Sequence, residues 1–242
     1  MTEALLKVEN VFKTYSQKGA AIKALQGLSF EIGRGQFVSV LGPSGSGKST
    51  LLRLLGGLER PTSGRIIFDE EEISSFRNNR RAGIRNKKVG FVFEAGNLLP
   101  RATALKNVDL PLVYAGVSHG ERTKRAQEEL KVLGLKDKLV APPSDLTLCE
   151  QVKVAIGRAA VNEPLVILAD EPTCLLDTKS EAEVMSVLER LNRLGTTLVL
   201  ATHQRRLANY GARVISLLGG KIVADRPVEK RKSAIRALLE KE

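Results

Sequence analysis

The sequence has no tryptophan, and its aromatic residues amount to only 4% of the chain. Hydrophobic residues still make up 43% of the 242 positions, so we expect an aliphatic core in a chain long enough for one large α/β domain. The two cysteines, Cys149 and Cys174, are too few for a disulfide framework and fit a reducing compartment.

Long apolar runs are also missing. No stretch approaches the roughly 18 apolar residues that cross a bilayer, and one of the longest, residues 164–169, ends at Asp170. The first fifteen residues lack the basic start and the apolar stretch of a secretory signal. We therefore expect a soluble chain in the cytoplasm.

Acidic residues are too few to balance the basic ones, and the net charge is +11. Basic side chains concentrate at residues 77–88 and 230–232. This excess suits a solvated exterior, an anionic membrane surface or nucleic acid, and we favour the first. Aromatic stacking platforms do not accompany the charge, so we expect no nucleic-acid partner. A steep salt dependence of DNA or RNA binding would revive that alternative.

The hydrophobic pattern predicts β-structure first, then helices, then β-structure again. Apolar segments indicate strands, a short segment after the third strand indicates a helix, and the charged amphipathic segment 121–133 indicates another helix within a helical region 95–160. The expected strands are 5–12, 24–32, 36–41, 65–69, 165–169 and 197–201, and the expected helices include 49–55 and 179–194.

The last two strands are apolar throughout, as strands buried on both faces of a parallel sheet are, and the helix 179–194 between them predicts a βαβ crossover. We expect a single α/β domain over residues 1–242, with a catalytic core and β subdomain in residues 1–94 and 161–242 and a helical subdomain in residues 95–160.

The segment after the third strand fits G-x-x-x-x-G-K-[ST] in full. In this pattern, glycines let backbone N–H groups wrap a phosphate chain, Lys48 supplies positive charge to the outer phosphates, and the Ser49 hydroxyl binds Mg²⁺. The following helix adds its positive N-terminal end. The predicted nucleotide-binding residues are Gly42, Pro43, Ser44, Gly45, Ser46, Gly47, Lys48, Ser49 and Thr50.

Two further strand ends carry polar side chains. Asp170 and Glu171 follow the buried strand 165–169, and we assign Asp170 to Mg²⁺ and Glu171 to general-base catalysis. His203 follows the next apolar strand, at the sheet edge where ligands gather. A neutral imidazole there can bond a γ-phosphate and hold the attacking water.

Longer segments extend these motifs into a resemblance that covers essentially the whole chain. On them, the chain resembles the ATP-binding subunit of an ABC transporter, most closely those of lipoprotein-release and macrolide-export type systems. The segments are 23–30, 56–64, 107–112, 170–173 and 201–203.

The resemblance implies a P-loop NTPase fold: a RecA-like parallel-sheet core, an N-terminal antiparallel β subdomain and an inserted helical subdomain. It also implies ATP and Mg²⁺ as cofactors, ATP-driven dimerisation, and stacking of Tyr15 on adenine.

The chain departs from the family pattern at the signature segment, residues 146–150. The family has Leu-Ser-Gly-Gly-Gln or Leu-Ser-Gly-Gly-Glu, and this chain has Leu-Thr-Leu-Cys-Glu. In the family this segment approaches the γ-phosphate held by a dimer partner, and glycine lets the backbone come close. Leu148 and Cys149 should weaken that approach. Thr147 keeps a hydroxyl, and with Glu150 it forms a capping box that predicts a helix start.

Two other segments differ. Glu94 stands where the family has glutamine; a carboxylate is a good Mg²⁺ ligand, but it adds negative charge beside the phosphates. Asp177 is kept, but Cys174-Leu175-Leu176 replaces the small and polar residues that usually precede it. In the family that segment faces the dimer partner.

The favoured function is an ATP-binding and ATP-hydrolysing subunit at the cytoplasmic face of the cell membrane. It would drive a separate membrane-spanning permease chain, of an exporter or a lipid- or lipoprotein-extruding system, through the loop 94–100 and the helical subdomain. A second ATPase subunit would complete a homodimer or heterodimer, and the altered signature favours an asymmetric pair or a slow regulatory ATPase. The alternative is a nucleotide-gated switch with little hydrolysis of its own.

Overall fold

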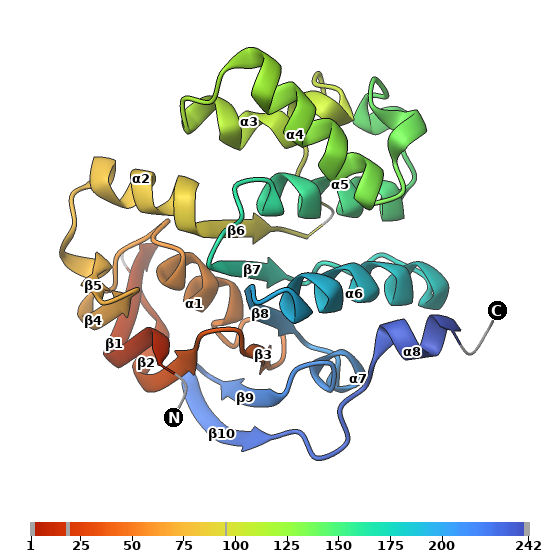
Figure 1. Ribbon diagram of the computed structural model, residues 1–242. Helices are drawn as coiled ribbons and strands as arrows, with labels where there is room; N and C mark the ends of the chain where they lie inside the picture. The colour runs from red at the N-terminus through yellow and green to blue at the C-terminus, as the bar shows by residue number, and fades with distance from the viewer. Residues whose placement is uncertain (1–2, 18–19, 95, 240–242) are drawn as a thin grey trace. The chain divides into compact units, whose positions relative to one another are not determined.

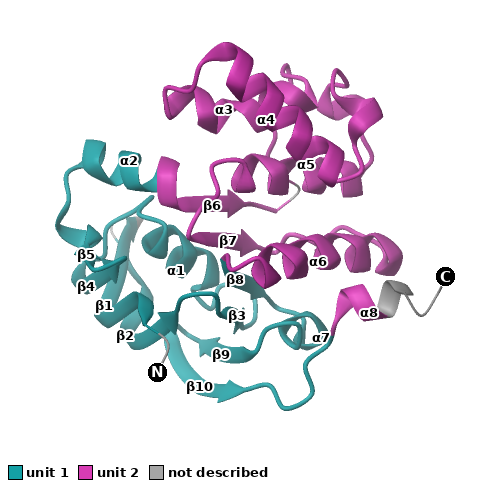
Figure 2. Ribbon diagram, viewed as in Figure 1, with its two compact units in different colours: residues 1–85, 197–232 teal, residues 86–196, 233–242 magenta. Residues whose placement is uncertain are grey.

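The computed structural model describes residues 3–17, 20–94 and 96–239, and the chain forms two compact units (Figure 2). Unit 1 contains residues 1–85 and 197–232, and unit 2 contains residues 86–196 and 233–242. Helix α2 (Asn78–Lys88) carries the chain from unit 1 into unit 2. Ala95, in the loop expected to dock a permease, and the outermost residues of the expected domain lie outside the described residues.

Unit 1 contains an antiparallel sheet in the strand order β2-β1-β4-β5. Strands β1 (Ala4–Gln17) and β2 (Ala20–Gly33) pair along most of their lengths, and β1 pairs on its other side with β4 (Ser63–Phe68). The short strand β5 (Glu71–Glu72) pairs with β4, and a 3₁₀ turn, Ile73–Ser75, follows it. The N-terminal antiparallel β structure is therefore as predicted.

Unit 1 also contains the strands that lead into the phosphate loop. Strand β3 (Phe37–Leu41) runs parallel to both β8 (Thr197–Thr202) and β9 (Arg213–Leu218), and β10 (Lys221–Pro227) pairs antiparallel with β9. Strand β8 is buried at every residue, as its apolar sequence predicted. Helix α1 (Lys48–Leu55) follows β3, and the short helix α7 (Arg205–Ala208) follows β8 (Figure 1).

Unit 2 contains the helical region. Helices α3 (Ala104–Tyr114), α4 (His119–Val132) and α5 (Leu148–Ala160) lie within the predicted range 95–160, with short 3₁₀ turns at Lys136–Lys138 and Pro143–Asp145. Their common interior is aliphatic, as the low aromatic content predicted, and includes Val108, Leu112, Leu130 and Val154 with no exposed surface. The subdomain boundaries at residues 95 and 160 remain a prediction.

The rest of unit 2 consists of two parallel strands, β6 (Val89–Val92) and β7 (Val166–Asp170), and two helices, α6 (Thr178–Arg193) and α8 (Ala234–Leu239). Glu189 joins the two helices, because its buried carboxylate accepts the backbone N–H groups of Ala234 at 2.8 Å and Ile235 at 3.3 Å. Helix α6 agrees closely with the predicted helix 179–194. Helices α2, α7 and α8 and strands β5, β6, β9 and β10 were not predicted.

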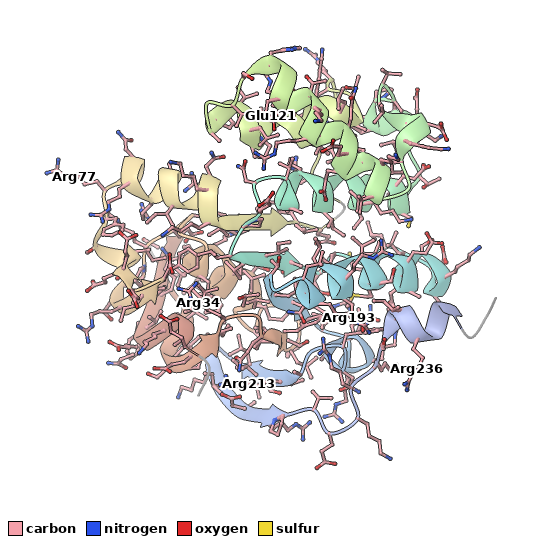
Figure 3. All side chains as sticks on the ribbon, in the orientation of Figure 1. Arg34, Arg77, Glu121, Arg193, Arg213 and Arg236 are labelled. Atoms are coloured by element: carbon pink, nitrogen blue, oxygen red, sulfur yellow. The ribbon has the colours of Figure 1, made fainter. Side chains whose placement is uncertain are left out.

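Part of the basic excess is neutralised within each unit. In unit 1, Arg34 pairs with Asp69 and Arg213 pairs with Asp225 through two nitrogens; in unit 2, Arg193 pairs with Glu189 at 2.8 Å (Figure 3). The Arg34–Asp69 pair is partly exposed and contributes little to stability, whereas Arg213 is held through two nitrogens and Glu189 is buried. These pairs identify which cations already have a counter-charge.

Candidate functional site

The predicted phosphate loop leaves strand β3 at Gly42, where the chain turns sharply. The backbone N–H of Gly42 donates to the carbonyl of Thr202 at 3.2 Å. A Cβ at Gly42 would lie 2.4 Å from Ser46 Oγ and 2.5 Å from the carbonyl oxygen of Leu217. Only glycine fits there, so the first glycine of the motif is fixed by packing.

The other two glycines allow the loop to close into helix α1. Gly45 and Gly47 have φ values of 76° and 102°, which residues other than glycine rarely adopt. A Cβ at Gly47 would lie 2.6 Å from the carbonyl oxygen of Ala24, whereas one at Gly45 would meet nothing within 4 Å. The loop is therefore held from the β2 side and open at Gly45, as a cradle for a ligand must be.

Lys48 is the first residue of α1, and its side chain folds back over the loop. It is 7% exposed, and its ammonium donates to the carbonyls of Gly42 at 2.8 Å and Pro43 at 3.2 Å. Ser46 Oγ is buried and has no hydrogen-bond partner among the described residues. A buried hydroxyl without a partner is costly, and a phosphate oxygen is a suitable acceptor for it. The loop thus fits a phosphate chain.

The remaining loop residues lie where the motif requires them. Pro43 and Ser44 are exposed at the outer turn, and Ser49 and Thr50 are half-buried in the first turn of α1. The Ser49 hydroxyl is therefore in the helical turn next to Lys48, the position that the motif gives to a metal ligand.

Tyr15 belongs to β1 and is held in place by its neighbours. Its hydroxyl donates to Glu59 Oε2 at 2.7 Å, and the Lys13 ammonium lies 4.9 Å from the centre of its ring. Burial raises the pKa of Tyr15, a hydrogen bond with Thr50 offsets part of that rise, and Glu59 adds to it. Thr50, the last residue of the predicted phosphate loop, is therefore a neighbour of the Tyr15 hydroxyl. Stacking on adenine remains a prediction.

His203 follows β8 directly. Strands β8 and β3 are parallel neighbours, with Thr202 opposite Leu41, so His203 and Gly42 leave the same edge of the sheet. Thr202 Oγ1 accepts the backbone N–H of Gln204 at 3.1 Å, which closes the turn around the exposed His203. Unit 1 therefore brings together the phosphate loop, Tyr15 and His203.

The acidic residues of the predicted site lie in unit 2. Asp170 ends β7, and β6 runs parallel to β7 with Val92 opposite Ala169. Glu94, two residues beyond β6, therefore leaves the same sheet edge as Asp170 and Glu171. One carboxylate oxygen of Asp170 and one of Glu171 are buried. Glu171 has a φ of 46°, a strained conformation of the kind found at functional sites.

Cys174 was not expected to contact Glu94. Its thiol donates to Glu94 Oε1 at 3.4 Å, across 80 residues of sequence, and its backbone N–H donates to the Glu171 carbonyl at 3.3 Å. Burial raises the pKa of the thiol to about 11, and Glu94 adds to the rise. Cys174 and Glu94, which both differ from the family pattern, are therefore hydrogen-bonded to each other. Sequence pattern alone gives no signal for such a contact.

The altered signature segment begins helix α5, as predicted. Thr147 is the N-cap, Glu150 N–H donates to its hydroxyl, and Thr147 N–H donates to Glu150 Oε2 at 2.8 Å. This donation lowers the pKa of Glu150. The capping box is confirmed, and the Thr147 hydroxyl is engaged in it.

Leu148 and Cys149 differ in where their side chains lie. Cys149 is only 9% exposed, and its sulfur lies 3.8 Å from the Ser180 carbonyl and from Glu183 Oε2 of helix α6. Leu148 is 45% exposed. The Cys149 side chain is therefore turned into unit 2, and Leu148 carries the bulk that remains at the exposed start of α5.

Asp177 caps helix α6. Its carboxylate accepts the backbone N–H groups of Lys179 at 2.9 Å and Ser180 at 3.0 Å and the Ser180 hydroxyl at 2.8 Å. The hydrogen bond from the Ser180 N–H lowers the pKa of Asp177. The residue is exposed, but a contact with a dimer partner remains a prediction. Its role within this chain is to start α6.

Among the residues that the structure describes, no three His, Cys, Asp or Glu side chains are grouped as a metal site. Mg²⁺ is commonly held by one or two protein ligands together with substrate phosphates, and the metal roles of Ser49 and of Asp170 remain predictions. Within the same described residues, no helix is long and apolar enough to span a membrane.

Comparison with known proteins gives the same family at each level. Residues 25–174 match the family described as ABC transporter. An ABC transporter ATP-binding protein of Thermotoga maritima, itself uncharacterized, is 45% identical over 218 residues, which are 90% of this chain and 93% of that protein. A macrolide export ATP-binding/permease protein of Vibrio parahaemolyticus is 42% identical over 93% of this chain, which spans only 34% of that longer protein.

Solved structures agree. The ATP-binding cassette MJ0796, in a dimeric post-hydrolysis state bound to ADP and Pi, is 40% identical to this chain and superposes with a TM-score of 0.87 over 93% of this chain and 99% of that one. A second dimeric structure of the same bacterial cassette has a TM-score of 0.86. The mixed α/β architecture, with parallel and antiparallel sheets, is that of the P-loop NTPases, as predicted.

Proposed function

The chain belongs to the ABC transporter family, and from that premise we propose that it binds and hydrolyses MgATP as the cassette of an export-type system. In this proposal ATP binding closes a dimer of cassettes, and closure acts on a separate membrane-spanning permease at the cytoplasmic face of the membrane. The relatives named for macrolide export favour an exporter, or a system that extrudes lipids or lipoproteins. The single observation that carries the proposal is the phosphate loop of unit 1.

The packing and burial of that loop support triphosphate binding. Gly42 and Gly47 are fixed by packing, Gly45 leaves open space, and Ser46 Oγ is buried with no protein partner in the described part of the chain. On ATP binding, Lys48 would transfer its hydrogen bonds from loop carbonyls to the outer phosphates. Because Lys48 is already buried, ATP binding does not incur the free-energy cost of removing its ammonium group from water.

The remaining residues take roles that follow from their chemistry. Ser49 and Asp170 would hold Mg²⁺, which supplies charge neutralisation of the phosphates when bound. Glu171 would accept a proton from the attacking water, and His203 would hold that water against the γ-phosphate. Tyr15, fixed by Glu59, would stack on the adenine.

The contact between Cys174 and Glu94 bears on the added carboxylate. Glutamine is neutral, so Glu94 adds a negative charge at the sheet edge that carries Asp170 and Glu171. The thiol of Cys174 donates to that carboxylate and gives it a fixed partner within unit 2. We infer that Glu94 is a direct or water-mediated Mg²⁺ ligand oriented by Cys174.

The altered signature segment limits how well one copy of the chain can contact the γ-phosphate bound by a second copy. Leu148 is the exposed obstacle at the start of α5, and Thr147 Oγ1 is engaged by the capping box. Loss of one well-placed donor to a transferring group costs about 10²- to 10³-fold in rate. A homodimer would suffer this loss in both sites, so we propose an asymmetric pair with an ATPase subunit whose signature is intact. The exposed Leu148 also favours the second candidate, a switch that binds ATP and scarcely hydrolyses it.

Mixing the unaltered chain with a helper variant tests the asymmetric pair. A helper that carries Lys48→Ala and Leu148→Gly loses its own phosphate-binding charge but presents a glycine in its signature segment. Added to the unaltered chain, it should raise phosphate release above the sum of the two separate rates. The matched control is the Lys48→Ala helper with Leu148 in place. Equal rates with both helpers, under conditions where ATP is bound, would favour the switch.

A further inference from the structure

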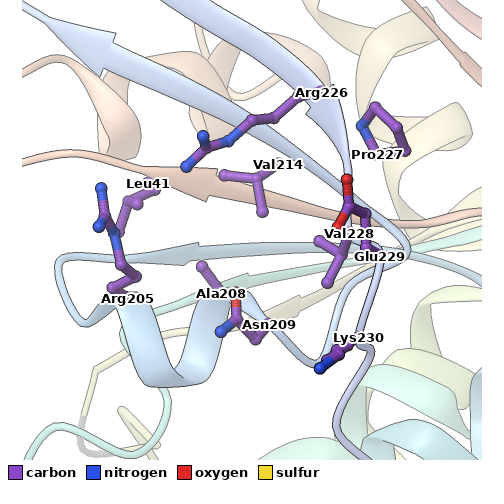
Figure 4. A pocket seen from close by; sticks show the side chains of 10 residues that line it. All are labelled: Leu41, Arg205, Ala208, Asn209, Val214, Arg226, Pro227, Val228, Glu229 and Lys230. Atoms are coloured by element: carbon purple, nitrogen blue, oxygen red, sulfur yellow. The ribbon is translucent and has the colours of Figure 1, made fainter.

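A pocket in unit 1 that starts at Leu41, directly before the phosphate loop, is lined by three cations. We call it the arginine pocket. Its charged lining is Arg205, Arg226, Lys230 and Glu229, and its apolar lining includes Leu41 and Val214 (Figure 4). Its volume is about 370 Å³, within the range of roughly 300 to 1,000 Å³ that small-molecule sites occupy.

The cations of this pocket are unpaired in the part of the chain that the structure describes. There, Arg205, Arg226 and Lys230 make no side-chain hydrogen bond or ion pair with a protein group, although Glu229 lines the same pocket. In Figure 4 the guanidinium groups of Arg205 and Arg226 both extend to the end of the pocket beside Leu41, and Glu229 lies at the other end, near Pro227. The acidic residue is therefore poorly placed to neutralise them.

A neighbouring hollow on the same strand pair shows the contrast. It is lined in part by Arg213, Asp225 and Arg226. There Arg213 is held by Asp225, with Nε 2.6 Å from Oδ1, and this bond raises the pKa of the guanidinium. Asp225 is thus occupied by Arg213. Arg226, the next residue along β10, is left without an acidic partner at the edge of the arginine pocket.

We propose that the arginine pocket binds a phosphate monoester with a small apolar group. Guanidinium groups recognise phosphate through paired N–H donors. The two positive charges of Arg205 and Arg226 match the double negative charge of a phosphate monoester better than the single charge of a carboxylate. A bare phosphate would leave the side of Leu41 and Val214 uncovered, whereas a compact apolar substituent would pack there. None of the phosphate-loop residues 42–50 lines this pocket, although Leu41 directly precedes that loop, and binding there would not depend on ATP hydrolysis.

Phenyl phosphate is a suitable probe, and inorganic phosphate is its bare-anion reference. Binding to the full chain is measured by titration calorimetry at low salt in the presence of saturating MgADP, which occupies the phosphate loop. Arg205→Gln and Arg226→Gln should each weaken phenyl phosphate binding about 5- to 10-fold, because each removes charge-assisted hydrogen bonds in an exposed setting. The charge-matched control is Arg77→Gln, an exposed arginine elsewhere in unit 1 (Figure 3).

The variants are also expected to fold, because removing one of two like-charged neighbours relieves repulsion. The midpoint temperature of thermal unfolding of Arg205→Gln and of Arg226→Gln should not be lower than that of the unaltered chain. The proposal is overturned if Arg77→Gln weakens binding as much as the pocket variants, or if neither pocket variant weakens it. Equal affinity for inorganic phosphate and phenyl phosphate would overturn the apolar part of the assignment.

A further arm separates a soluble ester from a lipid headgroup. Sedimentation with phosphatidylglycerol vesicles, compared with phosphatidylcholine vesicles, is measured with and without phenyl phosphate. Binding to the anionic vesicles that phenyl phosphate displaces, and that Arg205→Gln reduces, assigns the site to a lipid phosphate. Vesicle binding that neither change affects would assign it to the general basic surface and count against a lipid in this pocket.

Discussion

Replacing Leu148 by glycine should accelerate ATP hydrolysis by this chain alone, whereas the same change at Cys149 should not. Leu148 is 45% exposed at the first turn of α5, so its removal frees the helix start. Cys149 is 9% exposed and packs against α6, with its sulfur 3.8 Å from Glu183 Oε2. Its removal changes the interior of unit 2 and leaves the exposed obstacle in place.

The expected magnitudes differ accordingly. If the backbone of the signature segment can again contact the γ-phosphate, the rate gains up to about 10²-fold. Leu148→Gly should therefore raise kcat roughly 10- to 100-fold. Cys149→Gly should instead lower the free energy of unfolding by about 1 to 2 kcal/mol, from lost packing and from the lower helix propensity of glycine.

The assay is steady-state phosphate release at several protein concentrations, with chemical denaturation of each variant as the stability measurement. A variant with both glycines should match Leu148→Gly in rate and Cys149→Gly in stability, because the two side chains point to different surroundings. The reasoning is refuted if Cys149→Gly increases kcat as much as Leu148→Gly does, or if neither change has an effect while both variants bind ATP.

Two further predictions concern titrating groups in unit 2. Burial and Glu94 raise the pKa of the Cys174 thiol to about 11, so this thiol should react slowly with iodoacetamide at pH 8. Glu94→Gln should speed the reaction several-fold, because the thiolate fraction rises. Peptide mass spectrometry measures the rate at Cys174 separately from that at Cys149, and an unchanged rate would contradict the contact between Cys174 and Glu94. Burial and the Glu163 carboxylate raise the pKa of Glu129 from 4.5 to about 6, so its contribution to stability is present below pH 4.5 and is lost as pH rises through about 6. Glu129→Gln should therefore raise the free energy of unfolding at pH 7 by about 1 to 2 kcal/mol and change it little at pH 4, with exposed Glu128→Gln as the control; equal effects at both pH values would contradict this origin.

The parts of the fold that followed from sequence are those fixed by local chemistry. The glycine pattern around Lys48 fixed both the loop and the start of α1, and Thr147 with Glu150 fixed the start of α5. The apolar run before Asp170 identified a buried strand. Each of these depends on residues a few positions apart, so their physical causes lie within one short segment.

The parts that could not be predicted depend on contacts between distant segments. The bond between Cys174 and Glu94 joins residues 80 positions apart, and the inward direction of Cys149 depends on α6. Helix α2 was missed because its sequence is basic with almost no apolar face, and Arg81 is its one buried residue. Charge patterning alone does not distinguish such a helix from a loop.

The central claim is that this chain has a complete set of groups for its own ATP, but offers a defective signature to a second copy. Phosphate release per chain, measured across a range of protein concentrations with ATP binding followed in parallel and Glu171→Gln as the blank, tests it most directly. The account predicts that ATP binds while release stays low and does not rise with concentration. Release that rises with concentration and vanishes in Glu171→Gln would show that two copies close productively, and would contradict the account.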